Sequence, residues 1–307
     1  MNPAQFHKKL VWEEKHPLPE PLAGGASALF DQSLLLAGGT NWKNDKKCWL
    51  DRVDLYDFET DQWRSGPRLP RAFAYGCSAM THDGFEIIGG CDAAGANRSC
   101  WQLKWEGSTW RALDDAPEDF IFAAAESWGR NLYVFGGCSN DHDLSTAKDT
   151  VWVRDTNHQW HSIGTMPQGR MFICAHTNIE EKIYFFGGCT ASENGGVVNH
   201  NDVFSFDCQT YAWTRLHSLP VSSRGASAVV LNGRRIAILG GFGETFLTSV
   251  LIYDVERNLF TEETPLPIGV LDAQFVTHRG TLYGAGGEDG MRKRSARLFA
   301  GAFTRFI

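Results

Sequence analysis

Residues 34–70 read LLLAGGTNWKNDKKCWLDRVDLYDFETDQWRSGPRLP, and this stretch sets the pattern for the whole chain. It joins an apolar run to the pair Gly38-Gly39, a polar loop, Tyr56, and Trp63 with Pro70 seven residues later. Glycine pairs return at 38–39, 89–90, 136–137, 187–188, 240–241 and 286–287. An aromatic residue stands seven positions before a proline at 12, 63, 110, 160, 213 and 260. The 307-residue chain is therefore built from repeats of about 50 residues.

Repeats of this length and content resemble kelch repeats, each of which forms one four-stranded blade of a β-propeller. The resemblance covers essentially the whole chain and implies an all-β fold, a six-bladed kelch-type β-propeller formed by residues 1–307 as a single domain. We expect five blades at about 20–70, 71–117, 118–167, 168–220 and 221–267. The sixth blade combines 268–307 with 8–19.

Within the first blade, alternating residues predict strands at 26–30, 33–37, 52–58 and 62–65, counted from the channel outward. The glycine pair ends the second strand, where closely approaching backbones favour a positive φ. We expect the tyrosine and tryptophan of each repeat to pack between blades, and the proline to end the outer strand.

The N-terminus is predicted to close the ring. Trp12 and Pro19 have the spacing that ends a blade, yet no blade precedes them, while the sixth glycine pair begins a blade that lacks this ending. Phe299 and Phe306 are also seven residues apart, so the C-terminal tail is the competing source of the outer strand. We favour the N-terminal strand because only that segment carries the proline.

Composition narrows the class of protein. The 32 glycines and 11 tryptophans suit a turn-rich all-β chain, and a net charge of −7 without a long basic run argues against a nucleic-acid partner. No apolar run of roughly 18 residues suggests a membrane span, and the first residues lack a signal-peptide core, so we expect a cytoplasmic protein. The eight cysteines lack C-x-x-C spacing, and in that compartment we expect free buried thiols. The oligomeric state stays open, because outer strand edges can pair or remain free.

Two sets of loops are expected at one mouth of the channel, one after the glycine pairs and one entering the innermost strands. The second set carries Arg71, Arg170 and Arg224, which could form a cationic patch that holds a carboxylate. For each arginine the alternative is a structural hydrogen bond between blades. Glu288 directly follows the sixth glycine pair, and a carboxylate beside arginines can serve as a general acid or base.

Three stretches resemble a narrower family, the cyclically permuted branch of the bacterial sialic-acid mutarotases (N-acetylneuraminate epimerases). They are PLPEPLAG with AGGTNW between 17 and 42, the segments KKCWLD, LYD, LPR, AYG and IGGCDA between 46 and 93, and the Gly287-Glu288 turn. In the family, Gly-Glu is followed by a loop with Pro-Gly and then by Arg-Thr six residues after the glutamate. Here Arg294-Ser295 falls on Arg-Thr, but the Pro-Gly is missing, so Arg292 is a rival for the arginine role.

This resemblance implies an isomerase of carbohydrate metabolism that interconverts the α and β anomers of N-acetylneuraminate through the open-chain form. Glu288 would be the catalytic acid and base, Arg294 its catalytic partner, and no metal or organic cofactor would be needed. The small acidic sugar would be held at its carboxylate by Arg294 with help from the other arginines. The substrate-binding candidates are Arg71, Arg170, Arg224 and Arg292, with Asn41, Trp42, Tyr75 and Asp92 added on loop position. For Tyr75 core packing is the alternative.

Two other classes compete with a mutarotase. A non-catalytic kelch module would use the same mouth to bind a protein or a sugar. Metal-dependent chemistry would need converging ligands, and the nearest approaches are Asn140-Asp141-His142-Asp143 and His200-Asn201-Asp202. Neither matches a metal-ligand spacing, so we expect no metal site.

Overall fold

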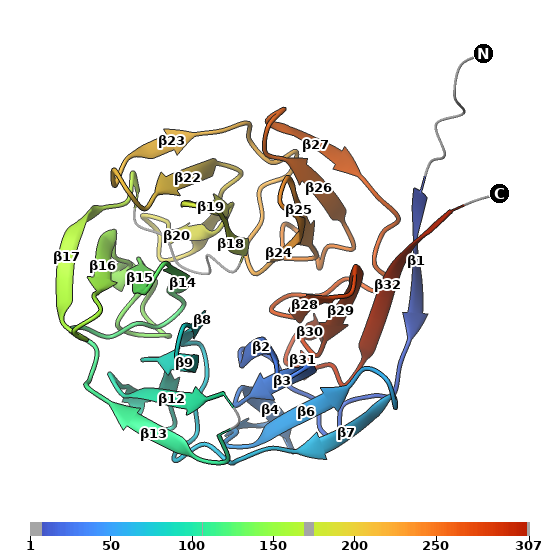
Figure 1. The fold of residues 1–307 in the computed structure, drawn as a ribbon, viewed down its shortest axis with the longest axis horizontal. Coiled ribbons are helices and arrows are strands. Elements are labelled where there is room, and N and C mark those ends of the chain that lie inside the picture. The colour runs from blue at the N-terminus through green and yellow to red at the C-terminus, as the bar shows by residue number, and fades with distance from the viewer. Residues whose placement is uncertain (1–7, 106, 169–174, 306–307) are drawn as a thin grey trace.

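The computed structural model describes residues 8–105, 107–168 and 175–305. They form a ring of six antiparallel sheets, each with four strands, around a central channel (Figure 1). The predicted all-β six-bladed propeller is therefore confirmed. In the first sheet three of the predicted strand ranges have the same bounds as the structure, and the strand predicted at 52–58 is one residue shorter at each end in the structure. This sheet holds β2 (Ala26–Phe30), β3 (Ser33–Ala37), β6 (Val53–Asp57) and β7 (Gln62–Ser65).

The next four sheets repeat this order from the channel outward. The second holds β8 (Cys77–Thr81), β9 (Gly84–Ile88), β12 (Cys100–Lys104) and β13 (Trp110–Leu113). The third holds β14 (Ala124–Trp128), β15 (Asn131–Phe135), β16 (Thr150–Arg154) and β17 (Trp160–Thr165). The fourth holds β18 (Ala175–Ile179), β19 (Lys182–Phe186), β22 (Val203–Asp207) and β23 (Trp213–Arg215). The fifth holds β24 (Ser227–Asn232), β25 (Arg235–Leu239), β26 (Val250–Asp254) and β27 (Leu259–Glu262).

The sixth sheet joins the two ends of the chain. It holds β28 (Gln274–His278), β29 (Thr281–Ala285), β32 (Leu298–Arg305) and, outermost, β1 (Lys8–Glu14). β1 runs antiparallel along β32, with Glu14 opposite Phe299 (Figure 1). A side chain at Gly301 would collide with the Trp12 indole, which packs there. β1 thus occupies the place that closure by the N-terminus predicts, and Phe306 of the competing tail lies outside the described residues.

The repeated tryptophan has a structural reason. In the first two repeats the indole N–H donates to a backbone carbonyl of the neighbouring blade: Trp63 to His16 at 3.0 Å and Trp110 to Pro67 at 2.8 Å. Each such contact places an aromatic ring in the wedge between two sheets, where it buries apolar surface. Tyr56 is fully buried beside Trp63, with ring centroids 5.1 Å apart. The inter-blade packing predicted for these residue types is confirmed.

The glycine pairs end the second strands with left-handed backbone. Gly38 and Gly39 have φ of 69° and 95°, and a Cβ on Gly38 would lie 2.3 Å from the carbonyl oxygen of Phe73 in the next blade. Only glycine combines this φ with such close approach. The chain then enters the mouth loops, four of which form short hairpins. They are β4 (Thr40–Lys43) with β5 (Lys46–Trp49), β10 (Cys91–Asp92) with β11 (Gly95–Ala96), β20 (Cys189–Ala191) with β21 (Val197–Asn199), and β30 (Glu288–Gly290) with β31 (Lys293–Arg294).

The mouth loop of the third blade instead carries the 3-10 helix η1 (Leu144–Thr146). The seven cysteines in the described part of the chain are free thiols; six are buried and Cys48 is half-buried. Among the described residues no helix is long and apolar enough to cross a membrane.

Candidate functional site

A ring of left-handed residues narrows the channel where the innermost strands begin. Gly24, Tyr75, Phe122, Gly225 and Asp272 stand at the same position of their repeats and have φ between 54° and 68°. Backbone hydrogen bonds pass from blade to blade along this ring: Tyr75 N–H to Gly24 (2.8 Å), Phe122 N–H to Tyr75 (2.5 Å) and Asp272 N–H to Gly225 (2.9 Å). Positive φ at non-glycine residues is uncommon and collects at functional positions. Backbone hydrogen bonds therefore link neighbouring blades at this constriction.

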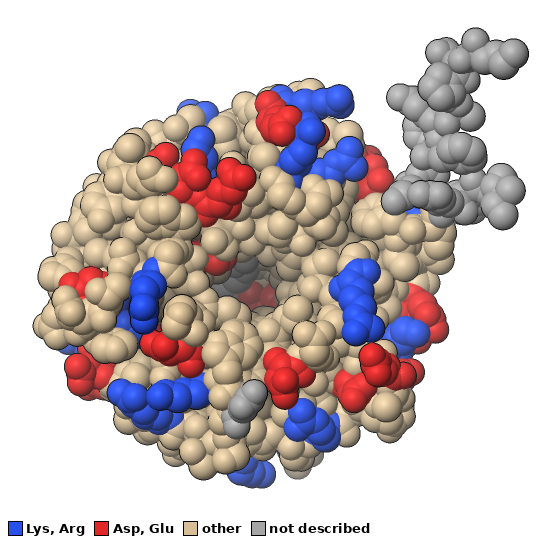
Figure 2. All heavy atoms as spheres, viewed as in Figure 1, with Lys and Arg blue, Asp and Glu red and all other residues tan. Residues whose placement is uncertain are grey.

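Two cavities meet at this constriction, and Tyr75, Phe122 and Asp272 line both. The mouth cavity, about 790 Å³, is bounded by the loops and hairpins. The inner chamber, about 370 Å³, is bounded by the innermost strands. Figure 2 shows the hollow at the centre of one face of the ring, with acidic atoms inside it.

Glu288 and Arg294 form the central ion pair of the site. They lie opposite each other in the β30–β31 hairpin, with Glu288 Oε2 2.6 Å from Arg294 Nη1. The other carboxylate oxygen, Oε1, accepts the backbone N–H of Arg292 at 3.0 Å. Glu288 is 18% exposed and lines the mouth cavity, whereas Arg294 is 6% exposed and is not among the lining residues. The carboxylate can therefore exchange a proton with a molecule in the cavity, and the guanidinium holds that carboxylate in place.

Arg294 also links three blades through Tyr75 and Thr40. Its Nη2 donates to the Tyr75 hydroxyl at 3.2 Å and to Thr40 Oγ1 at 3.2 Å. The Tyr75 ring lies over Gly24, where a Cβ would come within 2.3 Å of it. It packs against the Phe122 ring, with centroids 4.9 Å apart. Tyr75 thus packs in the constriction and also faces both cavities.

Two cations, Lys47 of the first blade and Arg224 at the entry to the fifth, line the mouth cavity together with five carboxylates: Asp141, Asp143, Glu193, Asp272 and Glu288. Lys47 Nζ lies 4.6 Å above the Tyr75 ring and 3.6 Å from Asp141 Oδ2. Arg224 donates from Nη1 to Asn199 Oδ1 at 2.7 Å. Both cations can reach an anion in the cavity, and guanidinium groups pair well with carboxylates.

The other predicted substrate contacts lie elsewhere. Arg71 pairs with Asp92, its Nε donating to Asp92 Oδ2 at 3.0 Å, and neither residue is among those lining the mouth cavity. Buried Asn41 donates to Glu20 Oε1 at 3.1 Å, which is a structural contact.

The remaining candidates lie beside the hairpins or outside the described residues. Arg292 lies with its guanidinium carbon 5.3 Å from the Trp42 ring centroid, at the exposed tip of the β30–β31 hairpin. Neither is among the residues that line the mouth cavity. Arg170 falls in 169–174, outside the described residues.

Lys47, Thr40 and Phe122 were missed as members of the site by sequence reasoning, and Asp141 was weighed only within a stretch that could approach a metal. Lys47 stands in the Lys46-Lys47-Cys48-Trp49 stretch that resembles the mutarotases, and that stretch was the one available signal. Phe122 had none, because its role depends on the left-handed backbone that it shares with Tyr75. Within the described ranges no group of three or more His, Cys, Asp or Glu side chains could hold a metal ion.

Comparison with known proteins places the chain among kelch-repeat proteins. Beta-scruin of Limulus polyphemus is 24% identical over 84% of this chain and 29% of its own length. An N-acetylneuraminate epimerase of Haemophilus influenzae (strain PittEE) is 26% identical over 57% of this chain and 55% of its own length. This chain therefore spans well under two thirds of either relative.

The solved structure entitled "Structure of YjhT" superposes with a TM-score of 0.76 at 15% identity, covering 92% of this chain and 95% of that one. At this identity the likeness is one of fold. A kelch motif matches residues 21–70, and the KLHDC2/KLHL20/DRC7 Kelch-repeats domain matches residues 116–287. Because that match covers more than half of the sequence, the chain belongs to the KLHDC2/KLHL20/DRC7 family of Kelch-repeats domains.

Proposed function

We propose that the mouth cavity binds an acidic sugar of the sialic-acid class and interconverts its α and β anomers. The observation that carries this proposal is the Glu288 carboxylate, which lines a cavity shared with Lys47 and Arg224 while Arg294 holds it from the buried side. The partial match to N-acetylneuraminate epimerase supports the same substrate class.

The chemistry needs a proton carrier and an anchor for the sugar acid. Ring opening removes the proton of the anomeric hydroxyl, breaks the bond between the anomeric carbon and the ring oxygen, forms the keto group and delivers a proton to that oxygen. Closure on the opposite face of the keto group reverses these steps, so the reaction is redox-neutral. Glu288 carries the proton, a role worth roughly 10²–10⁴-fold in rate. Arg224 and Lys47 hold the sugar carboxylate, and Arg294 positions Glu288.

Proton NMR of α-N-acetylneuraminate, freshly released by a sialidase, tests the proposal. With the protein present, the α signals should decay to the β-rich equilibrium faster than in buffer alone. Overlaying decay curves without line broadening would contradict the proposal, because the protein would then neither convert nor bind the sugar.

Arg224 and Arg71 provide a matched pair of variants. Arg224→Gln should weaken binding of the acid sugar about 10- to 100-fold, the effect of losing one charge-assisted hydrogen bond, and should change binding of a neutral hexose little. Arg71→Gln should leave both affinities unchanged, because Arg71 pairs with Asp92 and is not among the residues lining the cavity. Titrations followed by NMR measure both. Equal losses for acid and neutral sugars in Arg224→Gln would indicate a structural arginine.

A non-catalytic binding module is the second candidate. The observation in its favour is the extent of the matches: beta-scruin aligns with 84% of this chain and the epimerase with 57%. In the NMR experiment, broadened sugar signals with an unchanged anomer decay would support a sugar-binding module without catalysis.

A further inference from the structure

The inner chamber differs from the mouth cavity in the charge of its walls. The mouth cavity is lined by two cations, Lys47 and Arg224, together with five carboxylates. Among the described residues that line the inner chamber there is neither lysine nor arginine, and two carboxylates are present, Glu126 and Asp272. The described lining of the inner chamber therefore offers carboxylates without a basic side chain, whereas the mouth cavity offers both.

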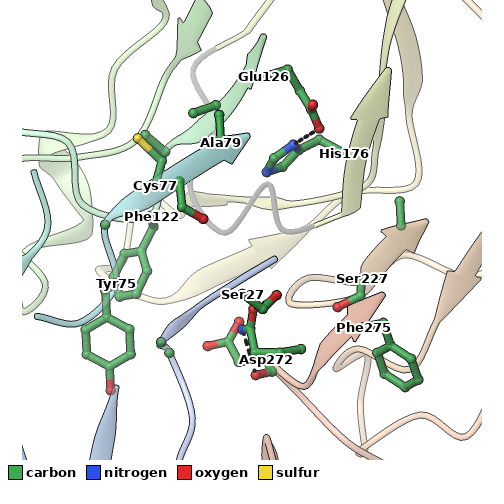
Figure 3. Close-up of a pocket in the computed structure, with 18 of the residues that line it drawn as sticks. Ser27, Tyr75, Cys77, Ala79, Phe122, Glu126, His176, Ser227, Asp272 and Phe275 are labelled. Atoms are coloured by element: carbon green, nitrogen blue, oxygen red, sulfur yellow. Dashed lines mark hydrogen bonds and ion pairs between the residues drawn. The ribbon is translucent and has the colours of Figure 1, made fainter. Parts of the chain in front are cut away.

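Glu126 and His176 form one wall of the inner chamber. They come from the neighbouring strands β14 and β18, and His176 Nδ1 lies 3.0 Å from Glu126 Oε1. The His176 side chain is 19% exposed and the Glu126 side chain is 18% exposed. Figure 3 shows the imidazole between the carboxylate and the open chamber, with its second ring nitrogen directed away from Glu126. The pair thus presents one polar ring atom and a negative charge to a ligand.

The opposite wall presents hydroxyl and amide groups. Ser27 Oγ donates to Gln274 Oε1 at 2.9 Å, and Ser227 Oγ donates to the Ala273 carbonyl at 2.5 Å. Each hydroxyl uses its proton in these bonds, so its lone pairs are left to accept from a ligand. Figure 3 shows Ser27, Ser227 and Asp272 across the chamber from His176. Acceptors therefore face the space from both sides.

We propose that the inner chamber is a second binding site, for a small polyhydroxylated amine. Its volume of about 370 Å³ falls within the usual 300–1,000 Å³ of small-molecule sites. The ammonium group pairs with the carboxylate of Glu126, and the hydroxyls bond to the serine and amide groups of the opposite wall. An anion of the same size is repelled, because like charges in a partly enclosed space oppose binding. This site is independent of the proposed mutarotase activity.

Three linear polyols that differ in one terminal group test the proposal: glucamine, sorbitol and gluconate, titrated at neutral pH by calorimetry. We expect glucamine to bind about 10-fold more tightly than gluconate, with sorbitol between them. Glu126→Gln should remove most of that preference. Glu193→Gln, which removes a carboxylate lining the mouth cavity, should preserve it. Equal affinities for the three polyols would overturn the proposal, as would a preference that depends on Glu193 and not on Glu126.

Ser78→Leu provides a second variant from another blade, and melting curves verify that each variant is folded. Ser78 lines the inner chamber from β8, so leucine there fills part of the space without changing the charge. We expect it to weaken binding of both glucamine and sorbitol about 10-fold or more. Undiminished binding by a folded Ser78→Leu protein would place the polyol site outside the chamber.

Discussion

Replacing Glu288 by glutamine should lower stability and slow anomer exchange by different amounts, which can be measured separately. Glutamine removes the charge that faces Arg294 Nη1 at 2.6 Å and leaves a guanidinium that is only 6% exposed. Removing a partner from a buried pair costs about 3–5 kcal/mol. Glutamine retains an acceptor oxygen, so we expect about 1–3 kcal/mol. At roughly 2–4 °C per kcal/mol the melting temperature should fall by about 2–12 °C.

The expected effect on the rate is larger. Glutamine neither takes up nor releases a proton, so the proposed acid–base contribution of about 10²–10⁴-fold is lost. That loss corresponds to about 2.7–5.5 kcal/mol of activation free energy. Anomer exchange is followed by proton NMR well below the melting temperature of the variant, where unfolding does not affect the rate.

The double variant Glu288→Gln/Arg294→Gln separates the two effects. It removes both charges, so it should recover most of the lost stability while remaining inactive. A folded Glu288→Gln protein with the wild-type rate would refute the role of Glu288. Activity that returns together with stability in the double variant would show that the pair is only structural.

Three further predictions concern the ring. Glu86 and Arg154 form a buried ion pair between β9 and β16 and are 1% and 6% exposed. Glu86→Ala should lower the free energy of unfolding, measured in urea, by about 3–5 kcal/mol, because it leaves a buried charge unpaired, and the double variant Glu86→Leu/Arg154→Met should lower it much less. Burial raises the pKa of Glu118, but the hydrogen bonds that it accepts from Thr150, Lys148 and Trp152 outweigh this and hold the pKa below the usual 4.5. The ionised carboxylate therefore stabilises the fold fully above pH 4.5, and this contribution is lost as the pH falls through the lower pKa of the folded state. Glu118→Gln should accordingly make the free energy of unfolding less dependent on pH in the acid range. Deleting residues 1–15 removes β1 with buried Leu10 and should lower the melting temperature by on the order of 10 °C.

Each of these predictions has an opposite outcome. If Glu86→Ala and Glu86→Leu/Arg154→Met are equally destabilised, the loss of packing outweighs the unpaired charge. Glu59→Gln is the control for the acid measurement, since that side chain is 78% exposed, and an equal effect from both glutamates would contradict the role of Glu118. An unchanged melting curve after the deletion would refute closure of the ring by the N-terminal strand.

Sequence reasoning predicted most of the fold because the pattern is local and repeated. The glycine pair at 38–39 requires a left-handed backbone, and the structure has it there. The strands 26–30, 33–37 and 62–65 appear with the same bounds as β2, β3 and β7. Trp12 and Pro19 have the spacing that ends a blade although no blade precedes them, which predicted that the N-terminal segment completes the last blade, and β1 lies beside β32.

Much less of the site could be predicted. The family resemblance implied that Arg294, with Arg292 as its rival, is the partner of Glu288, and Arg294 pairs with Glu288 directly. Arg71 and Asp92 were assigned to a ligand as separate residues, but they pair with each other. Loop position places a side chain at the mouth without fixing which neighbour satisfies its charge.

The sequence by itself determined the all-β class, the number of blades and the turns, because these depend on residues close together in one repeat. Only the tertiary structure decided that Lys47 of the first blade meets Tyr75 of the second and Asp141 of the third. It also decided that the constriction separates a mouth cavity lined by both cations and carboxylates from a chamber whose described lining carries carboxylates and neither lysine nor arginine. The physical reason is that ring closure brings together side chains about 30 to 250 residues apart, and their pairing depends on geometry that no single repeat encodes.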